Sequence, residues 1–254
     1  MTDLSGWVTA LEARHLANLT RPELTRALRA LSSCYVERRG KLGQGAALES
    51  AGKRAAFALY YAPLHFVTID AIVRAVGADS LRLQRLVDLG CGTGAAGAAW
   101  ALACGEPPTI HGVDRSGWAL QEAAWTYRHF QLRGRATHGN LVEAVPRDGT
   151  GTAVLLAYAV NELSSGQRDT LLDNLMKRST PGSPVLIVEP IARRLSGWWD
   201  EWCSRLGELG ARTDSWRFSA ALPPLVRDLA QSAGLGVREL TAKSIFVGVR
   251  GAGV

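Results

Sequence analysis

The stretch LVDLGCGTGAAGAAW, residues 86–100, places several glycines between an apolar run and a run of small residues. The apolar run is typical of a buried strand, and the small residues from Ala95 onward are typical of a helix. Between them, Gly90, Gly92 and Gly94 let the backbone turn sharply and come close to a ligand. The stretch therefore predicts a strand, a glycine loop and a helix, with the ligand crevice of an open parallel sheet at the loop.

Short apolar runs continue to the end of the chain and alternate at first with helical patterns, such as residues 117–132 and 165–178. This alternation is typical of an α/β fold, a parallel sheet with helices on both faces. The last two runs follow each other closely and predict a terminal hairpin with one antiparallel strand. The seven predicted strands are residues 86–90, 109–114, 136–140, 153–160, 185–190, 236–240 and 244–249.

The first 80 residues have a helical pattern. Thr20 and Glu23 have the spacing of a capping box at the start of one helix, which we expect to end at Gly40. Pro63 is expected to break the following apolar segment into two helices, residues 46–62 and 64–77. We predict an N-terminal helical cap over residues 1–80 and a ligand-binding Rossmann-like domain over residues 81–254.

The composition restricts the class of protein. At 254 residues with 47% hydrophobic residues, the chain can bury a sizeable core, which excludes a disordered chain. The formal net charge of +6 is compatible with nucleic acid, with acidic ligands or with no special partner. The four cysteines form no C-x-x-C pair, so we expect neither a metal site nor a disulfide framework. The absence of an N-terminal signal pattern and of a long apolar run predicts a cytoplasmic protein without a membrane partner.

Two acidic residues help to decide what the glycine loop binds. Residues 92–97, GTGAAG, also fit the dinucleotide pattern G-x-G-x-x-G, so NAD is one alternative. Asp88, at the strand end, would repel a pyrophosphate but attract the ammonium group of S-adenosyl-L-methionine. Asp114 lies about 20 residues beyond Gly94, where an acid accepts hydrogen bonds from ribose hydroxyls in either cofactor. The charge at Asp88 favours S-adenosylmethionine.

These residues match a known family. The segment VDLGCGTG, residues 87–94, resembles the first motif of class I S-adenosylmethionine-dependent methyltransferases, and HGVD, residues 111–114, resembles their ribose-binding strand end. The resemblance spans residues 81–249 and implies a Rossmann-like seven-stranded methyltransferase sheet with its last strand antiparallel. Asn140 would contact the adenine, because an asparagine carbonyl can accept from the adenine amino group. The implied cofactor-binding residues are Asp88, Gly90, Gly92, Gly94, Asp114, Arg115, Asn140 and Leu141.

Three further segments resemble a narrower group. Residues 54–66 (RAAFALYYAPLHF), 157–163 (AYAVNEL) and 188–190 (VEP) look like the methyltransferase-like proteins associated with the small ribosomal subunit. The cysteine-rich cluster-binding segment of that group is missing. The resemblance implies ribosomal RNA or a ribosome-associated acceptor. The alternatives are a small aromatic or acidic metabolite, a non-catalytic ribosome-assembly factor, and an NAD-dependent oxidoreductase.

Candidate catalytic residues lie where the transferred methyl group should point. Asn161 and Glu162 follow the fourth predicted strand, with helix capping and surface solvation as their structural alternative. We expect Tyr60, one of two adjacent tyrosines, to cover the cofactor. Tyr61 and His65 are further candidates for catalytic residues. Glu189, at the end of the fifth strand, either orients a substrate or satisfies loop N–H groups.

The acceptor side carries less specific signals. Trp198, Trp199 and Trp202 either wall a pocket for an aromatic acceptor or pack in the core. Basic residues could meet phosphate or be solvated; they are Arg38, Arg39, Lys41, Arg193 and Arg194. The chain has neither a D/N-P-P-Y tetrapeptide nor a Pro-Cys pair after the fourth strand. This disfavours adenine amino and carbon-5 pyrimidine methylation, and it leaves the acceptor atom and the oligomeric state open.

Overall fold

The computed structural model describes residues 3–37, 48–147, 150–178, 183–191, 197–236 and 239–248. The chain divides into two compact units, each described here by itself. The first unit comprises residues 1–67 and 218–240, and the second comprises residues 68–217 and 241–254. These units differ from the predicted division at residue 80, because the first unit also takes a segment from near the C-terminus.

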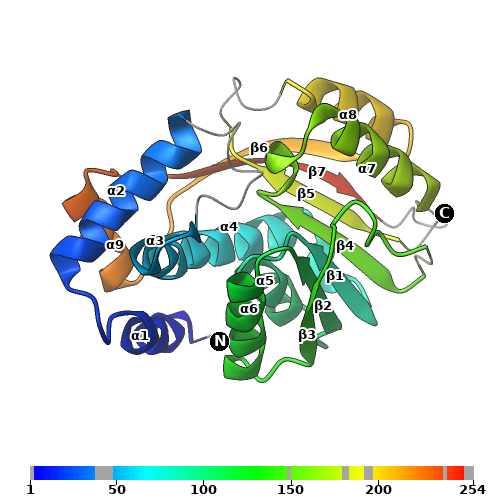
Figure 1. The fold of residues 1–254 in the computed structure, drawn as a ribbon. Helices are drawn as coiled ribbons and strands as arrows, with labels where there is room; N and C mark the ends of the chain where they lie inside the picture. Colours follow the sequence, from blue (N-terminus) through cyan, green and yellow to red (C-terminus); the bar gives the residue numbers. More distant parts are fainter. Residues whose placement is uncertain are drawn as a thin grey trace. The chain divides into compact units, whose positions relative to one another are not determined.

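The second unit is built on a seven-stranded sheet with the order β3-β2-β1-β4-β5-β7-β6 (Figure 1). Neighbouring strands from β3 to β5 pair in parallel, whereas β7 pairs antiparallel with β5. The predicted fold class, a Rossmann-like methyltransferase sheet with an antiparallel last strand, is confirmed. The strands are β1 Arg85–Leu89, β2 Thr109–Asp114, β3 Gly134–His138, β4 Thr152–Ala157, β5 Val185–Glu189, β6 Arg212–Phe218 and β7 Leu240–Val247.

The sixth strand was predicted at the wrong place. The sixth strand, β6, spans Arg212–Phe218, where no strand was predicted. Of the predicted strand at residues 236–240, residues 237 and 238 lie outside the described residues, and Leu240 begins β7. Helix α9, Pro224–Ala233, lies between β6 and β7, so the predicted terminal hairpin is also wrong. The strand at Arg212–Phe218 reads RTDSWRF and alternates between exposed and half-buried residues. Such a polar edge strand lacks the apolar run on which the sequence prediction depended.

Helices cover both faces of the sheet (Figure 1). On one face lie α5, Ala95–Ala103, and α6, Gly117–His129, whose Tyr127 packs against the Cα of Gly134 in β3. On the other lie α7, Ser165–Arg178, and α8, Trp199–Gly207, where Trp202 shares a buried cluster with Val87 of β1. The core of this unit therefore consists of two apolar layers, one on each side of β1, β4 and β5.

The first unit is helical, as predicted. It holds α1, Leu4–His15, α2, Arg21–Glu37, α3, Ala51–Ala56, and α9. The capping box is confirmed, because the Glu23 carboxylate accepts from the backbone N–H and the hydroxyl of Thr20, at 2.8 and 2.7 Å. Arg29 of α2 donates to the Ser232 carbonyl of α9 at 2.6 Å, which ties this distant segment into the unit. The predicted helix end at Gly40 lies outside the described residues.

Pro63 does not break the chain into two helices. The helix continues from Ala51 to Ala75, with a π-helical segment, Phe57–Tyr61, between α3 and α4, Ala62–Ala75. Proline has no N–H to give to a carbonyl one turn earlier, and the wider π turn, with Ala62 N–H on the Phe57 carbonyl, accommodates that loss. This helix is also long and apolar enough to cross a membrane. Such a helix is weak evidence for a membrane segment, because a buried core helix meets the same criteria.

Candidate functional site

The glycine loop has the backbone conformation that its sequence predicts. Gly90, Gly92 and Gly94 have φ values of 76°, 51° and 75°, a left-handed region that residues with side chains avoid. A Cβ on Gly94 would lie 2.8 Å from a ring carbon of Tyr127 and 3.0 Å from the backbone of Ala123. Gly94 is also the residue that precedes α5. The loop therefore needs glycine for both its conformation and its close packing.

Asp88 lies beneath this loop and is buried. One carboxylate oxygen accepts from the backbone N–H of Gly97 in the first turn of α5, at 3.1 Å. The other oxygen, Oδ1, has no hydrogen-bond partner among the described residues. Burial raises the pKa of Asp88 to about 7, and the nearby Asp114 carboxylate adds to this effect. A buried carboxylate with an unused oxygen is suited to a cationic group, because a cation would offset the cost of its ionisation.

Asp114 ends β2 and joins two loops. Its carboxylate accepts from the backbone N–H of Gly92 at 2.9 Å and of Ser116 at 2.8 Å. The parallel strands β1 and β2 end at the same edge of the sheet, so their loops meet there. The predicted ribose contact of Asp114 stays a prediction, but the side chain stands beside the glycine loop as that role requires.

Asn140 follows β3 and is already engaged. Its carbonyl oxygen accepts from the Val142 backbone N–H at 3.1 Å and from the Arg115 guanidinium at 3.2 Å, while its amide nitrogen donates to Glu143 at 3.0 Å. An adenine amino group would have to share or replace one of these donors. Next to it, a methyl carbon of Leu141 lies 3.5 Å from the position of a Cβ on Gly90. The structure thus brings Arg115, Asn140 and Leu141 to the edge of the sheet that holds the glycine loop, and their cofactor contacts stay predictions.

A second cluster lies at the carboxyl ends of β4 and β5. Glu189, the last residue of β5, is fully buried. Its carboxylate accepts from the backbone N–H groups of Val160 and Asn161 at 2.9 and 3.2 Å, and from the side-chain amide of Asn161. Glu189 therefore satisfies the loop N–H groups, as one of its two alternatives predicts, and it fixes Asn161; its role in orienting a substrate stays a prediction.

Asn161 in turn holds a tryptophan. The Trp198 indole N–H donates to the Asn161 side-chain carbonyl at 3.0 Å. The half-buried Trp198 ring packs edge-on against Trp199 and Trp202, with centroid distances of 5.4 and 4.8 Å. Trp199 and Trp202 are core residues, whereas Trp198 keeps part of its surface exposed. Glu162 is exposed, and its catalytic role stays a prediction.

Sequence reasoning missed two members of this cluster. Lys243 of β7 is opposite Glu189 in the antiparallel register, and its ammonium lies 4.1 Å from the centre of the Trp199 ring. Burial lowers the pKa of Lys243, and Glu189 opposes that shift. Tyr158, just after β4, adopts a left-handed φ of 60° and bonds through its hydroxyl to Thr68. Lys243 and Glu189 are some 50 residues apart in the sequence, so no local sequence pattern predicts that they pair. A tyrosine with positive φ has no sequence signature either.

Tyr60, Tyr61 and His65 belong to the first unit. The rings of Tyr60 and Tyr61 meet edge-on at 5.1 Å, and Tyr61 lies 6.2 Å from His65. Burial raises the pKa of Tyr60 to about 12 and lowers that of His65 to about 3, so both are neutral at physiological pH. Their roles in covering the cofactor and in catalysis stay predictions.

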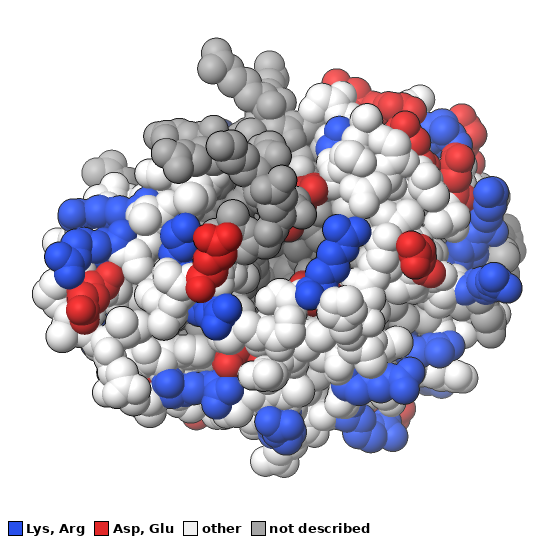
Figure 2. Space-filling view, viewed as in Figure 1, with Lys and Arg blue, Asp and Glu red and all other residues white. Residues whose placement is uncertain are grey.

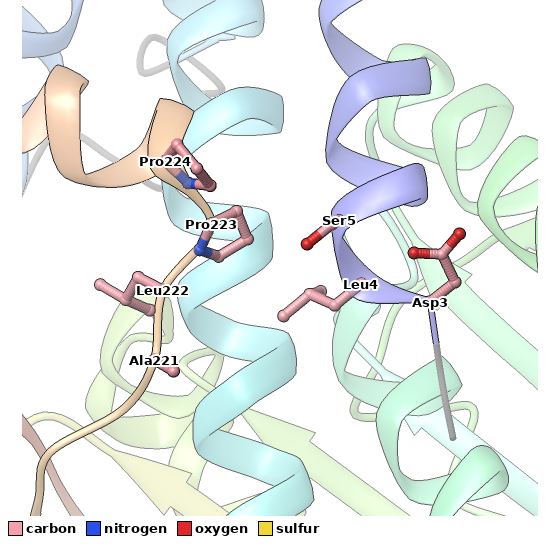
Figure 3. A pocket seen from close by; sticks show the side chains of 7 residues that line it. All are labelled: Asp3, Leu4, Ser5, Ala221, Leu222, Pro223 and Pro224. Carbon is pink, nitrogen blue, oxygen red and sulfur yellow. The ribbon is translucent and has the colours of Figure 1, made fainter.

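The first unit also contains a hollow of about 490 Å³, where the starts of α1 and α9 meet (Figure 3). Its lining is mostly apolar and holds no predicted site residue. The Asp3 carboxylate at its rim already caps α1 by accepting from Gly6 N–H at 2.8 Å. No group of three or more candidate metal ligands occurs in the described part of the chain. The basic candidates Arg38, Arg39, Lys41, Arg193 and Arg194 lie outside it.

Comparison with known proteins agrees with this geometry. Residues 86–182 match the sequence model of a family described as a methyltransferase domain. No curated protein matches the sequence. The fold is similar to magnesium protoporphyrin IX methyltransferase from Synechocystis, which was solved with S-adenosylmethionine. The identity is 15%, with 72% of this chain and 78% of that chain covered and a TM-score of 0.48.

Two other solved structures are similar to a comparable extent. The N-methyltransferase NodS from Bradyrhizobium japonicum, in complex with S-adenosylhomocysteine, is 11% identical, with 71% and 83% of the two chains covered and a TM-score of 0.49. A putative RNA methyltransferase from Pyrococcus horikoshii is 11% identical, with 78% and 84% covered and a TM-score of 0.46.

The matched segment contains the glycine loop, both acids and the strand that leads to Asn161. Residues 86–182 are a methyltransferase domain, and S-adenosylmethionine is the cofactor that its glycine loop and its two acids fit. The family match favours this cofactor over NAD, the alternative that the glycine pattern left open.

Proposed function

We propose that this methyltransferase acts on RNA, with ribosomal RNA as the first substrate to test. One observation carries the choice of a flat aromatic acceptor. Trp198 is held by Asn161 at the carboxyl ends of β4 and β5, and this tryptophan is only half-buried. Nucleobases in single-stranded RNA stack on such aromatic side chains. The net charge of +6 favours a polyanion over a neutral ring compound.

The bound cofactor would supply an electrophilic methyl group on a sulfonium. Asp88 would hold the ammonium end of the cofactor with its unused oxygen, and the Gly90–Gly94 backbone would lie against its methionine part. Asp114 would orient the ribose while it keeps the glycine loop in place. Much of the catalysis of such a transfer is positioning of the two reactants in line.

On the acceptor side, the residues bind and orient. Glu189 is buried and its carboxylate is occupied by donors from the β4 loop, so it fixes Asn161 rather than taking a proton from the acceptor. Asn161 then sets the plane of Trp198, against which the acceptor ring would stack. An arrangement of this kind suits a ring nitrogen with a free lone pair, which loses no proton on methylation and therefore needs no base.

The test is transfer of a labelled methyl group from S-adenosylmethionine. Purified protein is incubated with ribosomal RNA, with total RNA depleted of ribosomal RNA, and with a nucleic-acid-free metabolite extract. Label that enters ribosomal RNA and is released by ribonuclease is the expected result. Label that enters only the metabolite fraction would replace RNA by a small aromatic or acidic acceptor.

Calorimetry with S-adenosylhomocysteine and with NAD accompanies this assay, with Gly92→Val as the non-binding control. Binding of S-adenosylhomocysteine without transfer to any fraction would favour the non-catalytic assembly factor. A branched side chain at Gly92 is incompatible with its φ of 51°, so this variant should bind neither compound.

A further inference from the structure

One face of the sheet carries a row of basic residues near the amino-terminal ends of β1, β2 and β3, with arginines on β1 and β3 and a histidine on β2 between them. Arg135 of β3 is the register partner of His111 in β2, and His111 is the partner of Val87 in β1. Side chains alternate between the two faces along a strand, so Arg85, two residues before Val87, lies on the same face as Val87. Arg85, His111 and Arg135 therefore share one face across three neighbouring strands.

Arg133 extends this row. Its backbone carbonyl accepts from Ile110 N–H at 2.8 Å, which places it beside the start of β2. The following residue, Gly134, faces α6, since a Cβ there would lie 2.7 Å from the Tyr127 ring. Arg133 and Arg135, on either side of Gly134, thus extend from the opposite face of the sheet. We name Arg85, His111, Arg133 and Arg135 the basic face.

The charge of the basic face is not neutralised within the described residues. The three arginines are exposed, and no carboxylate among the residues that the structure describes forms an ion pair with them. The Arg85 guanidinium is held by the Thr152 hydroxyl, at 3.3 and 3.4 Å. His111 bonds to the hydroxyl of Thr137, and its pKa is lowered by burial and by the positive charges of Arg135 and Arg85. Figure 2 shows Lys and Arg side chains gathered at the lower right, where β1 to β3 lie in Figure 1.

We propose that the basic face binds the phosphodiester backbone of a single-stranded RNA acceptor, an inference that rests on the proposed function. Guanidinium groups pair with phosphate oxygens in a two-pronged geometry, and the exposed arginines on β1, on β3 and just before β3 offer several such groups. With strands about 4.8 Å apart, the row from β1 to β3 spans about 10 Å. That length accommodates more than one phosphate of a single strand, whose rise is roughly 3.4 Å per nucleotide in a duplex.

The position of the face suits a polymer better than a small molecule. It lies at the amino ends of the strands, whereas the glycine loop and Asn161 lie at their carboxyl ends. The six residues of β2 separate these ends by about 17–20 Å at roughly 3.3 Å per residue. A small metabolite cannot contact both places. A strand of several nucleotides can do so, with its backbone on the basic face and its target nucleotide near Trp198.

The experiment measures binding of a fluorescein-labelled, 20-nucleotide single-stranded RNA of mixed sequence by anisotropy over a series of KCl concentrations. The variant Arg133→Glu/Arg135→Glu is compared with Arg26→Glu/Arg227→Glu, which changes the net charge equally at exposed arginines of the first unit. The first variant should lose at least about 10-fold in affinity at 0.1 M KCl. The slope of log affinity against log salt should fall by about 1.4, since each lost phosphate contact removes roughly 0.7.

An equal loss in both variants would attribute RNA binding to net charge and overturn the proposal, as would unchanged binding by Arg133→Glu/Arg135→Glu. Retained binding of S-adenosylhomocysteine shows that this variant is folded. Methyl transfer separates the two proposals. RNA that binds through the basic face but accepts no methyl group contradicts only the proposed function. Full methylation of RNA by the variant, with unchanged affinity, contradicts only the basic face.

Discussion

Replacement of Asp88 by asparagine should stabilise the ligand-free protein, and it should do so only at high pH. The buried carboxyl has its pKa raised from 3.8 to about 7. A carboxyl with a raised pKa favours the folded state when protonated, so its contribution is complete below about pH 4 and is lost as the pH rises through 7. A rise of about three units in the pKa of Asp88 corresponds to at most about 4 kcal/mol in the free energy of unfolding. The amide oxygen of the substituted side chain would still accept from Gly97 N–H, without any charge.

The assay is urea denaturation of the wild type and Asp88→Asn at pH 4.5, 6 and 8. The stability difference in favour of the variant should grow from near zero to a few kcal/mol over this range. At the same time the variant should bind S-adenosylhomocysteine more weakly at pH 8, because it lacks the carboxylate that would pair with the ammonium group. A stability difference that is the same at all three pH values would refute the reasoning, as would a variant that binds the ligand normally.

Three further predictions concern other parts of the molecule. Gly94→Ala should cost about 1–3 kcal/mol in the free energy of unfolding and abolish S-adenosylhomocysteine binding, because of its left-handed φ and its contact with α6; Gly105→Ala, with open space around it, is the control and should change neither. Asn161→Ala should lower the free energy of unfolding by about 1–3 kcal/mol in chemical denaturation and shift the tryptophan emission, because it removes a donor to buried Glu189 and the acceptor of the Trp198 indole N–H. The control variant Glu162→Ala, at an exposed residue, should leave the emission unchanged. The His65 imidazole should show no titration by NMR between pH 5 and 8, because burial lowers its pKa to about 3, and a midpoint inside that range would contradict the lowered pKa.

The cofactor loop could be predicted from the sequence because its determinants are local. A strand, three glycines with positive φ and a following helix lie within one stretch of the chain, and Asp114 has a typical spacing from them. The capping box at Thr20 was predictable for the same reason, since both of its partners are three residues apart.

The features that could not be predicted depend on distant pairing or on packing. The edge strand β6 is polar, so it has no apolar run that separates it from a loop. Lys243 meets Glu189 only through the antiparallel register of β7 on β5. Pro63 is a local signal, but proline alone does not distinguish a helix break from a π-helical turn within a continuous helix.

The close packing of Gly90 against Ala159 has a consequence for the order of events at the site. A Cβ on Gly90 would lie 2.6 Å from the Ala159 methyl group, so the loop after β1 and the loop after β4 are in direct contact. A ligand that moves Gly90 toward Ala159 must also move the segment that carries Asn161. Binding free energies are reciprocal, so the factor by which the cofactor changes acceptor affinity is also the factor by which the acceptor changes cofactor affinity. We therefore expect cofactor binding and acceptor binding to be coupled through the contact between these two loops.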